Sequence, residues 1–448
     1  MNRFKNILLA AVAALMMIPS AIFAQSYGSI NTFSPYSMYG LGEMSTQGTL
    51  LTRSMGGAGT ALRSSAEINL LNPASYSITM SKSVLFSYGM EASNYFNCQT
   101  VDGSNVYNSY AAANFRDIAL QIPVAEKLGV GFSVTPYSSS GYEISTLDYL
   151  TDVGLLSYTY EGGGDITQVS LGVGWEPFKD FSIGIAAKYY WGTLARSFTM
   201  IPYVVTGNGT YYSTLGESSY VVSSVKAQVG MQWSIINSSK ENLVLGATYD
   251  LGGNLNPTYN HTVIGSSSLV YIVASSLSEK LPLYLPNKVA VGASYQNAAW
   301  ILALDYTYED WYSKNSSSTE VTSSGMVVAY NDFQTIKAGM QWTPNRNDVR
   351  NYFRRVSYRG GLRYGGYQQS FDGETIKQYA ITAGAAFPLK MGSISKIDLS
   401  LEYGSRGSND IVLENATSVG LIRQDYFKIG LGFTLFGQDY WFQRPKFD

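Results

Sequence analysis

The sequence has few of the residues on which enzymes and soluble domains depend. Asp, Glu, Lys and Arg together make up 14% of 448 residues, against about 25% in a typical soluble domain. There is one histidine, His261, and one cysteine, Cys98. This excludes a disulfide within the chain and a metal site built from His and Cys; Cys98 is expected to be a free thiol in a loop. The formal net charge of −2 predicts no nucleic-acid partner.

Catalytic motifs are also absent. No Gly-x-Ser-x-Gly elbow occurs, and His261 falls in a predicted loop, where a solvated side chain is expected. Gly57-Ala58-Gly59 lacks the preceding strand and the third glycine that dinucleotide binding requires. We therefore predict that the chain is not an enzyme and has no catalytic residue, no metal site and no cofactor.

Long apolar runs are missing after the first residues. Residues 1–24 have Arg3 and Lys5 before an apolar stretch, and Ala24 offers a small residue for cleavage before Gln25. This predicts a cleaved signal peptide; an uncleaved helical anchor is the alternative, but the stretch is short for a span of about 20 residues. Since no other segment can cross a membrane as a helix, the remaining way to span one is a closed β-barrel. We expect the outer membrane of a Gram-negative cell.

Alternation of apolar and polar residues, typical of strands, recurs through the chain. Between Val225 and Trp233, for example, Val, Ala, Val, Met and Trp alternate with Lys, Gln, Gly and Gln. The predicted strands are 83–97, 107–122, 128–137, 157–176, 181–199, 218–236, 242–256, 286–297, 299–312, 330–343, 354–370, 376–390, 394–408 and 424–436. Their links alternate between short and long, as in bacterial outer-membrane barrels. The fold class is therefore all-β, a transmembrane antiparallel barrel of about fourteen strands.

Tryptophans occur where these strands meet short links. Trp175, Trp233 and Trp342 end strands before a short link, and Trp300 begins a strand after one. The pattern predicts an aromatic girdle at one rim of the barrel. The alternative is isolated core tryptophans in a soluble sandwich.

Ten glycines are predicted to point into the barrel: Gly172, Gly184, Gly230, Gly246, Gly292, Gly339, Gly361, Gly384, Gly430 and Gly432. Glycine weakens a strand, so its repeated use indicates close approach of another segment. Residues 25–82 lack alternation and are predicted to form an N-terminal hatch inside the lumen; a disordered periplasmic arm is the alternative. Residues 83–436 form the barrel, and 437–448 a periplasmic tail.

Six cations are also predicted to point inward: Lys188, Lys226, Lys337, Arg359, Arg363 and Lys428. They could hold the carboxylate of a substrate. The plainer expectation is that they pair with acids of the wall or hatch, namely Asp250, Asp305, Asp398, Glu402, Glu43 and Glu67.

Two segments carry a family resemblance. Residues 55–61, MGGAGTA, are followed by LLNPA at 70–74, and LPNKVAVGASY at 285–295 is followed by Trp300 and Trp311. These resemble the long-chain fatty acid and hydrocarbon transporters of the outer membrane, the FadL/TodX-like family. The similarity in layout covers nearly the whole mature chain.

The resemblance implies a hatch whose Asn-Pro-Ala motif, here Asn72, Pro73 and Ala74, lies beside a kinked third strand. In that family, ligand enters from outside and leaves sideways through an opening at this kink. The corresponding candidates here are Pro136 and Gly141. Since proline removes a ladder hydrogen bond, an opening is physically reasonable; that Pro136 merely ends the strand is the alternative.

The family also captures ligand in its outer loops. In the fourth loop, 257–285, the apolar candidates are Leu269, Ile272, Val273 and Leu277. They are expected either to form a small helix that receives ligand or to pack on the barrel mouth.

The leading hypothesis is passive uptake of small hydrophobic compounds such as long-chain fatty acids, through hatch gating and lateral exit. The alternative is a non-transport scaffold or secretion-linked protein on the same fold, and a hydrolase that uses His261 is a third. The expected partners are outer-membrane lipid, a hydrophobic small molecule or detergent, the barrel assembly machinery and, for the alternative, secretion-system proteins.

Overall fold

A computed structural model describes residues 32–78, 83–101, 103–151, 153–205, 212–266, 271–315, 320–321, 327–389, 394–409 and 421–438. The predicted signal peptide, Leu269 and nearly all of the predicted tail lie outside these residues. No helix among them is long and apolar enough to cross a membrane.

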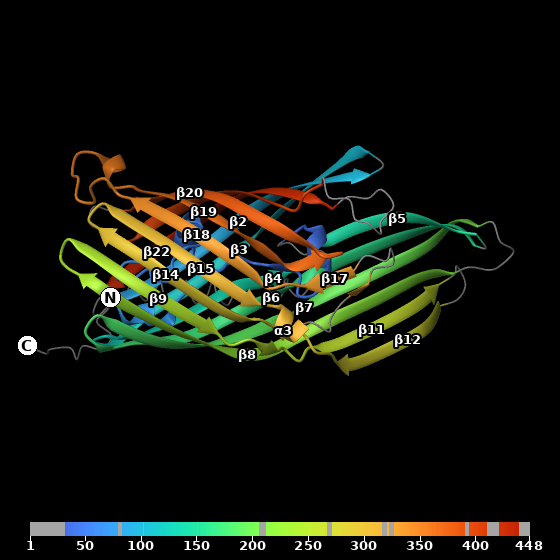
Figure 1. Ribbon diagram of the computed structural model, residues 1–448, viewed down its shortest axis with the longest axis horizontal. Helices are drawn as coiled ribbons and strands as arrows, with labels where there is room; N and C mark the ends of the chain where they lie inside the picture. The colour runs from blue at the N-terminus through green and yellow to red at the C-terminus, as the bar shows by residue number, and fades with distance from the viewer. Residues whose placement is uncertain are drawn as a thin grey trace, which may run out of the picture.

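Fourteen strands close into an antiparallel barrel (Figure 1). They are β2 (Ser83–Val101), β3 (Ser104–Ala125), β4 (Leu128–Ser139), β6 (Gly154–Phe178), β7 (Phe181–Val205), β8 (Ser213–Asn237), β9 (Glu241–Asp250), β14 (Asn287–Asn297), β15 (Trp300–Asp310), β18 (Phe333–Trp342), β19 (Ser357–Phe371), β20 (Glu374–Pro388), β21 (Lys396–Arg406) and β22 (Arg423–Gln438). Each pairs with the next, and β22 pairs with β2 to close the ring. The predicted fold class is confirmed, because every predicted strand corresponds to one of these.

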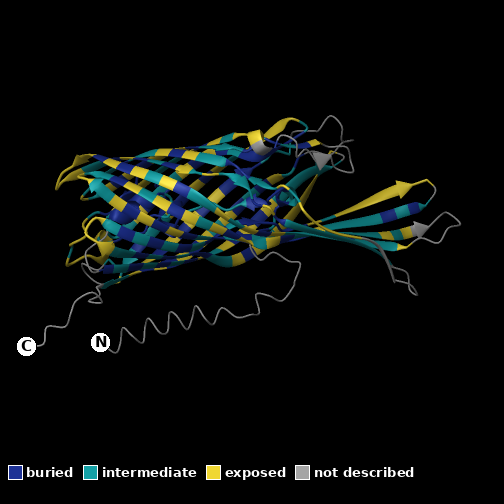
Figure 2. Ribbon diagram, turned by 90° about the horizontal axis from the view of Figure 1, so that it is seen from below, coloured by how far each residue is buried: buried dark blue, intermediate teal, exposed yellow. Residues whose placement is uncertain are grey.

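Shorter elements lie at the two rims of the barrel. At the long-loop rim lie β5 (Tyr142–Leu150), β10 (Gly253–Asn254), β11 (Thr258–Ser266), β12 (Tyr271–Lys280), β13 (Tyr284–Leu285), α3 (Tyr312–Asn315), β16 (Glu320–Val321) and β17 (Val327–Tyr330), and η4 (Tyr352–Arg354) lies in the link between β18 and β19. Strands β5, β6, β7, β8, β11 and β12 pair in that order beyond the barrel, and we call this projecting sheet the outer wing (Figure 2). In bacterial barrels the long-loop rim faces outside, so the outer wing is extracellular.

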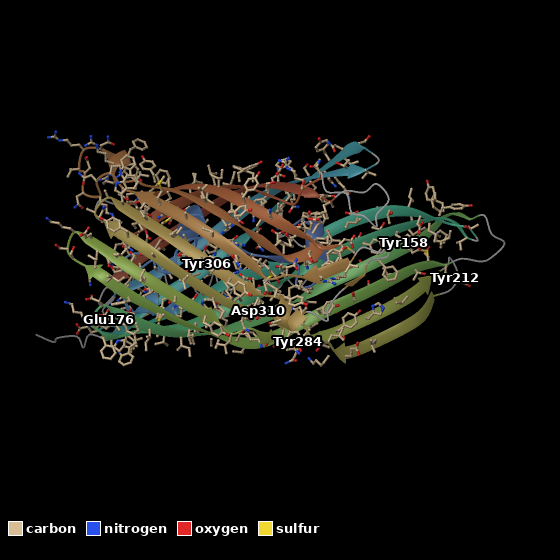
Figure 3. The ribbon with its side chains drawn as sticks, in the orientation of Figure 1. Tyr158, Glu176, Tyr212, Tyr284, Tyr306 and Asp310 are labelled. Carbon is tan, nitrogen blue, oxygen red and sulfur yellow. The ribbon has the colours of Figure 1, made fainter. Side chains whose placement is uncertain are left out.

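The outer wall is apolar. Along β15 exposed and buried residues alternate, and the exposed ones are Trp300, Leu302, Leu304 and Tyr306. Tyr306 projects from the middle of the wall (Figure 3), and Figure 2 shows the same alternation around the barrel. A band of this kind dissolves in lipid, while the opposite face of each strand lines the lumen.

The four predicted girdle tryptophans share the short-link rim and point outward. Their exposed fractions run from 39% for Trp300 to 55% for Trp233. Trp300 and Trp342 are Cα partners on β15 and β18, with ring centroids 5.8 Å apart. Glu176, next to Trp175, marks this rim in Figure 3, and Tyr158 and Tyr212 mark the opposite end. Exposed tryptophans at one rim are what a membrane-water boundary requires.

Hatch residues 32–78 pack inside the lumen against the barrel wall. This described part of the hatch contains η2 (Pro35–Met38), β1 (Glu43–Met44), α2 (Leu50–Ser54) and η3 (Pro73–Ser77). All ten predicted inward glycines face another segment so closely that a Cβ would press on its atoms, and in every case the hatch supplies one or more of those atoms. For example, a Cβ on Gly361 would overlap Met55 and Gly56, and one on Gly184 would overlap Pro73 and Ala74. The glycines therefore let the hatch backbone lie directly on the wall.

We predict that Gly361→Val loosens the hatch, whereas Gly360→Val leaves it docked. A Cβ on Gly361 would overlap hatch backbone, but one on the neighbouring Gly360 would meet only Met340 Cε at 3.6 Å and Thr382 O at 3.9 Å. Overpacking costs about 1–3 kcal/mol, which raises the undocked population by about 5- to 150-fold. The rate of limited proteolysis within the hatch measures this. Equal rates in the two variants would show that the glycine contact does not hold the hatch.

Candidate functional site

The Asn-Pro-Ala motif docks on the wall near the short-link rim. Asn72 caps η3, and its Oδ1 accepts a hydrogen bond of 3.0 Å from Ala74 N. Its Nδ2 donates to Thr60 O at 2.9 Å and to Met231 O on β8 at 3.0 Å. Asn72 is fully buried, so its amide fixes both the local turn and the place of the hatch on the wall.

This docking site is not the kink of the third strand. The resemblance implied that the motif lies beside Pro136, but Asn72 contacts β8 and the motif overlies Gly184 on β7. The hatch segment that does contact the kink is Glu43–Gln47. Ser45 N donates to Tyr137 O at 2.8 Å, and Gln47 Nε2 donates to Pro136 O at 3.2 Å. No pattern in the sequence indicates that residues 43–47 contact the wall.

The barrel wall is interrupted beside that segment. Strand β3 pairs with β4 only from Ile118 to Ala125, and in the described residues the outer half of β3, 104–117, pairs only with β2. Strand β5 likewise pairs only with β6 in the described part of the chain. We call the interruption between 104–117 and the strands β4 and β5 the lateral gap.

The hatch occupies the edge that β3 leaves unpaired. Strand β1 pairs antiparallel with the end of β4, with Glu43 opposite Ser139 and Met44 opposite Ser138. A small cavity of about 20 Å³ remains here, bounded by Ser45, Pro136 and residues 112–116 of β3. Within the described residues, β1 therefore takes the place of β3 only beside Ser138 and Ser139, at the end of β4.

Bulges flank the lateral gap on both sides. The β2–β3 register shifts between Gly89 and Met90, opposite Arg116, and the β4–β6 register shifts between Pro136 and Ser138. A bulge bends its strand and ends regular pairing, so β3 and β4 diverge. Strand β4 continues past Pro136 to Ser139, so the proline does not end the strand.

Gly141 and Arg116 fasten the hatch across the lateral gap. Gly141 N donates to Ser37 Oγ at 2.9 Å, and Gly141 O accepts from Ser34 N at 2.8 Å. On the other side, Arg116 Nη2 donates to Thr46 O at 2.5 Å. The two proposed exit residues, Pro136 and Gly141, thus both bind hatch residues.

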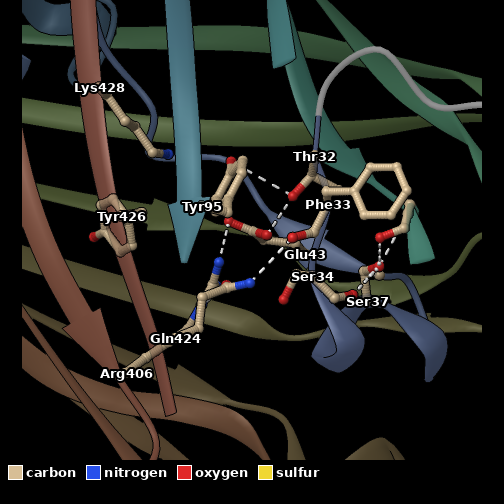
Figure 4. Close-up of polar contacts among 12 residues, drawn as sticks. Thr32, Phe33, Ser34, Ser37, Glu43, Tyr95, Arg406, Gln424, Tyr426 and Lys428 are labelled. Carbon is tan, nitrogen blue, oxygen red and sulfur yellow. Dashed lines mark hydrogen bonds and ion pairs between the residues drawn. The ribbon is translucent and has the colours of Figure 1, made fainter. Parts of the chain in front are cut away.

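Glu43 anchors β1 to the far wall (Figure 4). Its Oε1 lies 2.8 Å from Arg406 Nη2, and its Oε2 accepts a 2.5 Å hydrogen bond from Thr32 Oγ1. Burial raises the pKa of this carboxyl, but the positive charges of Arg406 and Lys428 outweigh burial, so the pKa lies below its ordinary value. Glu43 therefore stays ionised and paired at neutral pH.

The inward cations mainly pair with acids of the wall, which is the plainer of the two expectations from the sequence. Arg359 Nη1 lies 2.6 Å from Asp398, Arg363 Nη2 lies 2.5 Å from Glu402, and Lys188 binds Asp250. Lys226 donates to Asn254 O at 2.8 Å, and Lys428 lies 3.9 Å from Glu91. Lys337 has no hydrogen bond or ion pair in the described part of the chain.

Two of the predicted acids bind the hatch to the wall. Asp305 Oδ2 accepts hydrogen bonds of 2.8 Å from Gly59 N, Thr60 N and Thr60 Oγ1. Glu67 on the hatch binds Lys396 and lies 3.7 Å from Arg359. These charged contacts hold the hatch in the lumen.

A polar cavity of about 150 Å³ remains between hatch and wall. Its lining includes Glu43, Asp250, Lys288, Lys337 and Arg363. Bringing an apolar molecule here would remove charged groups from water without compensation. The cavity is therefore unsuited to a purely hydrophobic ligand.

The apolar candidates of the fourth loop do not form a helix. Strands β11 (Thr258–Ser266) and β12 (Tyr271–Lys280) pair in the outer wing, so the helix alternative is wrong for the candidates that the structure describes. Leu277 is 45% exposed. Ile272 and Val273 lie on β12, and Leu269 lies outside the described residues. His261, predicted to lie in a loop, lies on β11 instead, which pairs with β8 on its other side.

Comparison with known proteins gives the following. The model of a family described as BamG matches residues 4–448, and no curated protein matches. The CymD monoaromatic hydrocarbon channel is similar with a TM-score of 0.57 and 13% identity, and the match covers 87% of this chain and 97% of that one. A Pseudomonas aeruginosa FadL homologue has a TM-score of 0.55 and 12% identity, with 89% of this chain and 99% of that one covered. The P. putida toluene transporter TodX has a TM-score of 0.55 and 14% identity, with 90% of this chain and 99% of that one covered. At these identities the similarity establishes the fold, and the FadL/TodX-like resemblance is confirmed at that level. CymD and TodX are named as a channel and a transporter, not as enzymes.

Proposed function

The chain belongs to the BamG family, and we propose that it is an outer-membrane channel for the passive uptake of small hydrophobic compounds such as long-chain fatty acids. In this proposal the hatch is the gate, and the compound leaves sideways through the lateral gap. The observation that carries the proposal is the pairing of β1 with β4, where β3 would otherwise pair. A wall sealed by a two-residue hatch strand can open without breaking the barrel.

A route straight through the lumen is less suitable. The hatch is buried against the wall, and the remaining cavity is lined by charged side chains such as Lys337 and Arg363. A hydrophobic compound gains nothing by crossing such a surface to reach water. Sideways exit delivers it directly into hydrocarbon.

The gate is held by few interactions. Apart from the β1 pairing, the segment is fixed by the Glu43–Arg406 ion pair and by hydrogen bonds with Thr32, Arg116, Thr135, Pro136 and Tyr137. A neutral hydrogen bond contributes a net of about 0.5–1.5 kcal/mol. The segment can therefore leave β4 for several kcal/mol, while Asn72 and Asp305 keep the rest of the hatch docked.

The substrate class has support from the similar structures. CymD is named a monoaromatic hydrocarbon channel and TodX a toluene transporter. Both have this fold at 13–14% identity. We propose by analogy that this chain also passes apolar compounds.

The test is uptake by cells that express the chain, compared with cells that lack it. We expect faster entry of labelled toluene and oleate, and no change for labelled ribose, because the lateral route ends in hydrocarbon. Faster ribose entry would indicate a water-filled pore and contradict the proposal. Unchanged entry of both hydrophobic probes would equally contradict it.

We also propose outer-membrane lipid and the barrel assembly machinery as partners. The apolar outer wall requires the first, and insertion of a barrel requires the second. The description of the matched family supports a link to barrel assembly. Co-purification of the chain with assembly components from its own membrane tests this link.

A further inference from the structure

A second pocket lies on the outer wing and shares no lining residue with the lumen cavity. Its volume is about 140 Å³. Six side chains define it: Tyr39 of the hatch, Tyr142 of β5, Tyr160 of β6, Arg196 and Phe198 of β7, and His261 of β11. We call it the outer pocket. The proposed gate uses none of these side chains.

Two glycines give the outer pocket flat aromatic walls. Gly162 is the Cα partner of Tyr142, and Gly216 is the Cα partner of Phe198. A Cβ on either glycine would overlap the ring of its partner, so each ring lies on bare backbone, as in aromatic rescue of strand glycines. The rings therefore present a face rather than an edge to the space between them.

One side of the outer pocket is cationic. Arg196 Nη2 donates to Gly40 O at 2.7 Å, and its guanidinium lies 5.3 Å from the ring centroid of Tyr220. Arg196 Nε is buried and has no hydrogen-bond partner among the described residues, and the same holds for His261 Nδ1. None of the residues that line the pocket is acidic.

Size and chemistry together specify an occupant. A cavity of about 150 Å³ accommodates benzene, so the outer pocket fits one ring. The side chain of Arg196 lines the pocket, and a carboxylate binds a guanidinium group through strong charged hydrogen bonds. We propose that the outer pocket binds small aromatic carboxylates, with the ring between Tyr142 and Phe198 and the carboxylate on Arg196 and His261.

The outer pocket also contacts the hatch. Met38 and Tyr39 line it, and Gly40 accepts the hydrogen bond of Arg196. These residues precede β1 by only a few positions, so an occupant contacts the segment that leads to the gate. A role in capturing compounds for uptake rests on the proposed function; binding itself does not.

Isothermal titration of the purified protein in detergent tests binding, with sodium phenylacetate and toluene as probes. We expect phenylacetate to bind more tightly than toluene, and Arg196→Gln to weaken phenylacetate by about tenfold or more through loss of a charged hydrogen bond. Arg423→Gln is the matched control, because Arg423 pairs with Asp425 outside the pocket. It should bind like wild type.

Two further variants keep the test informative if Arg196→Gln does not fold. Phe198→Ala should weaken both probes, and His261→Ala should weaken phenylacetate alone, even if Arg196→Gln fails to fold. Equal affinity for toluene and phenylacetate in the wild-type protein overturns the proposal. So does unchanged phenylacetate binding in folded Arg196→Gln or His261→Ala.

The titration and the uptake assay can fail independently of each other. Binding in detergent needs no open gate, so phenylacetate binding together with absent uptake would leave the outer pocket standing and reject the channel. Uptake of toluene without phenylacetate binding would reject the outer pocket and leave the channel.

Discussion

A disulfide that joins the hatch strand to the wall stops uptake of hydrophobic compounds. The variant combines Met44→Cys and Ser138→Cys, with Cys98→Ser to remove the native thiol. Met44 and Ser138 are Cα partners in the β1–β4 pair, and antiparallel partners lie about 4.5–5.5 Å apart, within disulfide range. Oxidation should lower toluene uptake more than about tenfold, which requires the open state to lose about 1.4 kcal/mol or more. A reductant should restore uptake.

The matched control is a disulfide elsewhere in the wall. Leu302 and Met340 are also Cα partners, and both are exposed on the outer wall. Leu302→Cys with Met340→Cys, in the same Cys98→Ser background, should take up toluene equally in both redox states. If the oxidised 44–138 variant still takes up toluene normally, β1 is not the gate.

The second large effect concerns the buried charges of the lumen. Arg363→Met should destabilise the folded protein by about 3–5 kcal/mol, because it takes the nearest cation away from the buried carboxylate of Glu402. Arg363 Nη2 lies 2.5 Å from Glu402 Oε1, and the two side chains are 8% and 6% exposed. Adding Glu402→Gln should recover much of the loss, since no carboxylate then remains unpaired. Urea unfolding of the barrel in lipid vesicles measures both changes.

An exposed pair on the same barrel provides the comparison. Arg423 Nη2 lies 3.0 Å from Asp425 Oδ2, with side chains 45% and 26% exposed. Arg423→Met should change stability by less than about 1 kcal/mol, because water screens such pairs. Equal effects of Arg363→Met and Arg423→Met would show that the lumen pairs do not stabilise the fold.

The barrel could be predicted from the sequence because its physics is local and periodic. A strand with lipid on one face and a packed lumen on the other has to alternate, so β8 and β18 were evident. The inward glycines were informative for the same reason. Gly361, at a position where a side chain would ordinarily point inward, indicated that something lies against the wall, and the structure shows Met55 and Gly56 there.

The site could be predicted only in part. The sequence contains the motif at Asn72, but a three-residue motif does not encode the strand on which it docks, and Asn72 contacts β8 and not the kink at Pro136. Strand β1 could not be predicted, because two residues have no period and their partners Ser138 and Ser139 lie 94 and 96 positions away. The sequence predicts a loop at His261 where the structure has a strand, because polar residues dominate the outer wing, where no lipid imposes alternation.

The sequence indicates the aromatic-glycine pairs of the outer pocket only weakly. Gly162 and Gly216 lie within the long strands β6 and β8, and Tyr142 and Phe198 come from neighbouring strands. Only the register joins each ring to its glycine, and register between long strands depends on turns that the sequence specifies poorly.

The most direct test is a density map of the protein in a lipid nanodisc at a resolution that shows strand pairing. The gate account predicts that residues 104–117 of β3 have no partner on the β4 side, and that Glu43 and Met44 pair with Ser139 and Ser138. Pairing of β3 with β4 along their full lengths, with residues 43–47 elsewhere in the lumen, would contradict it.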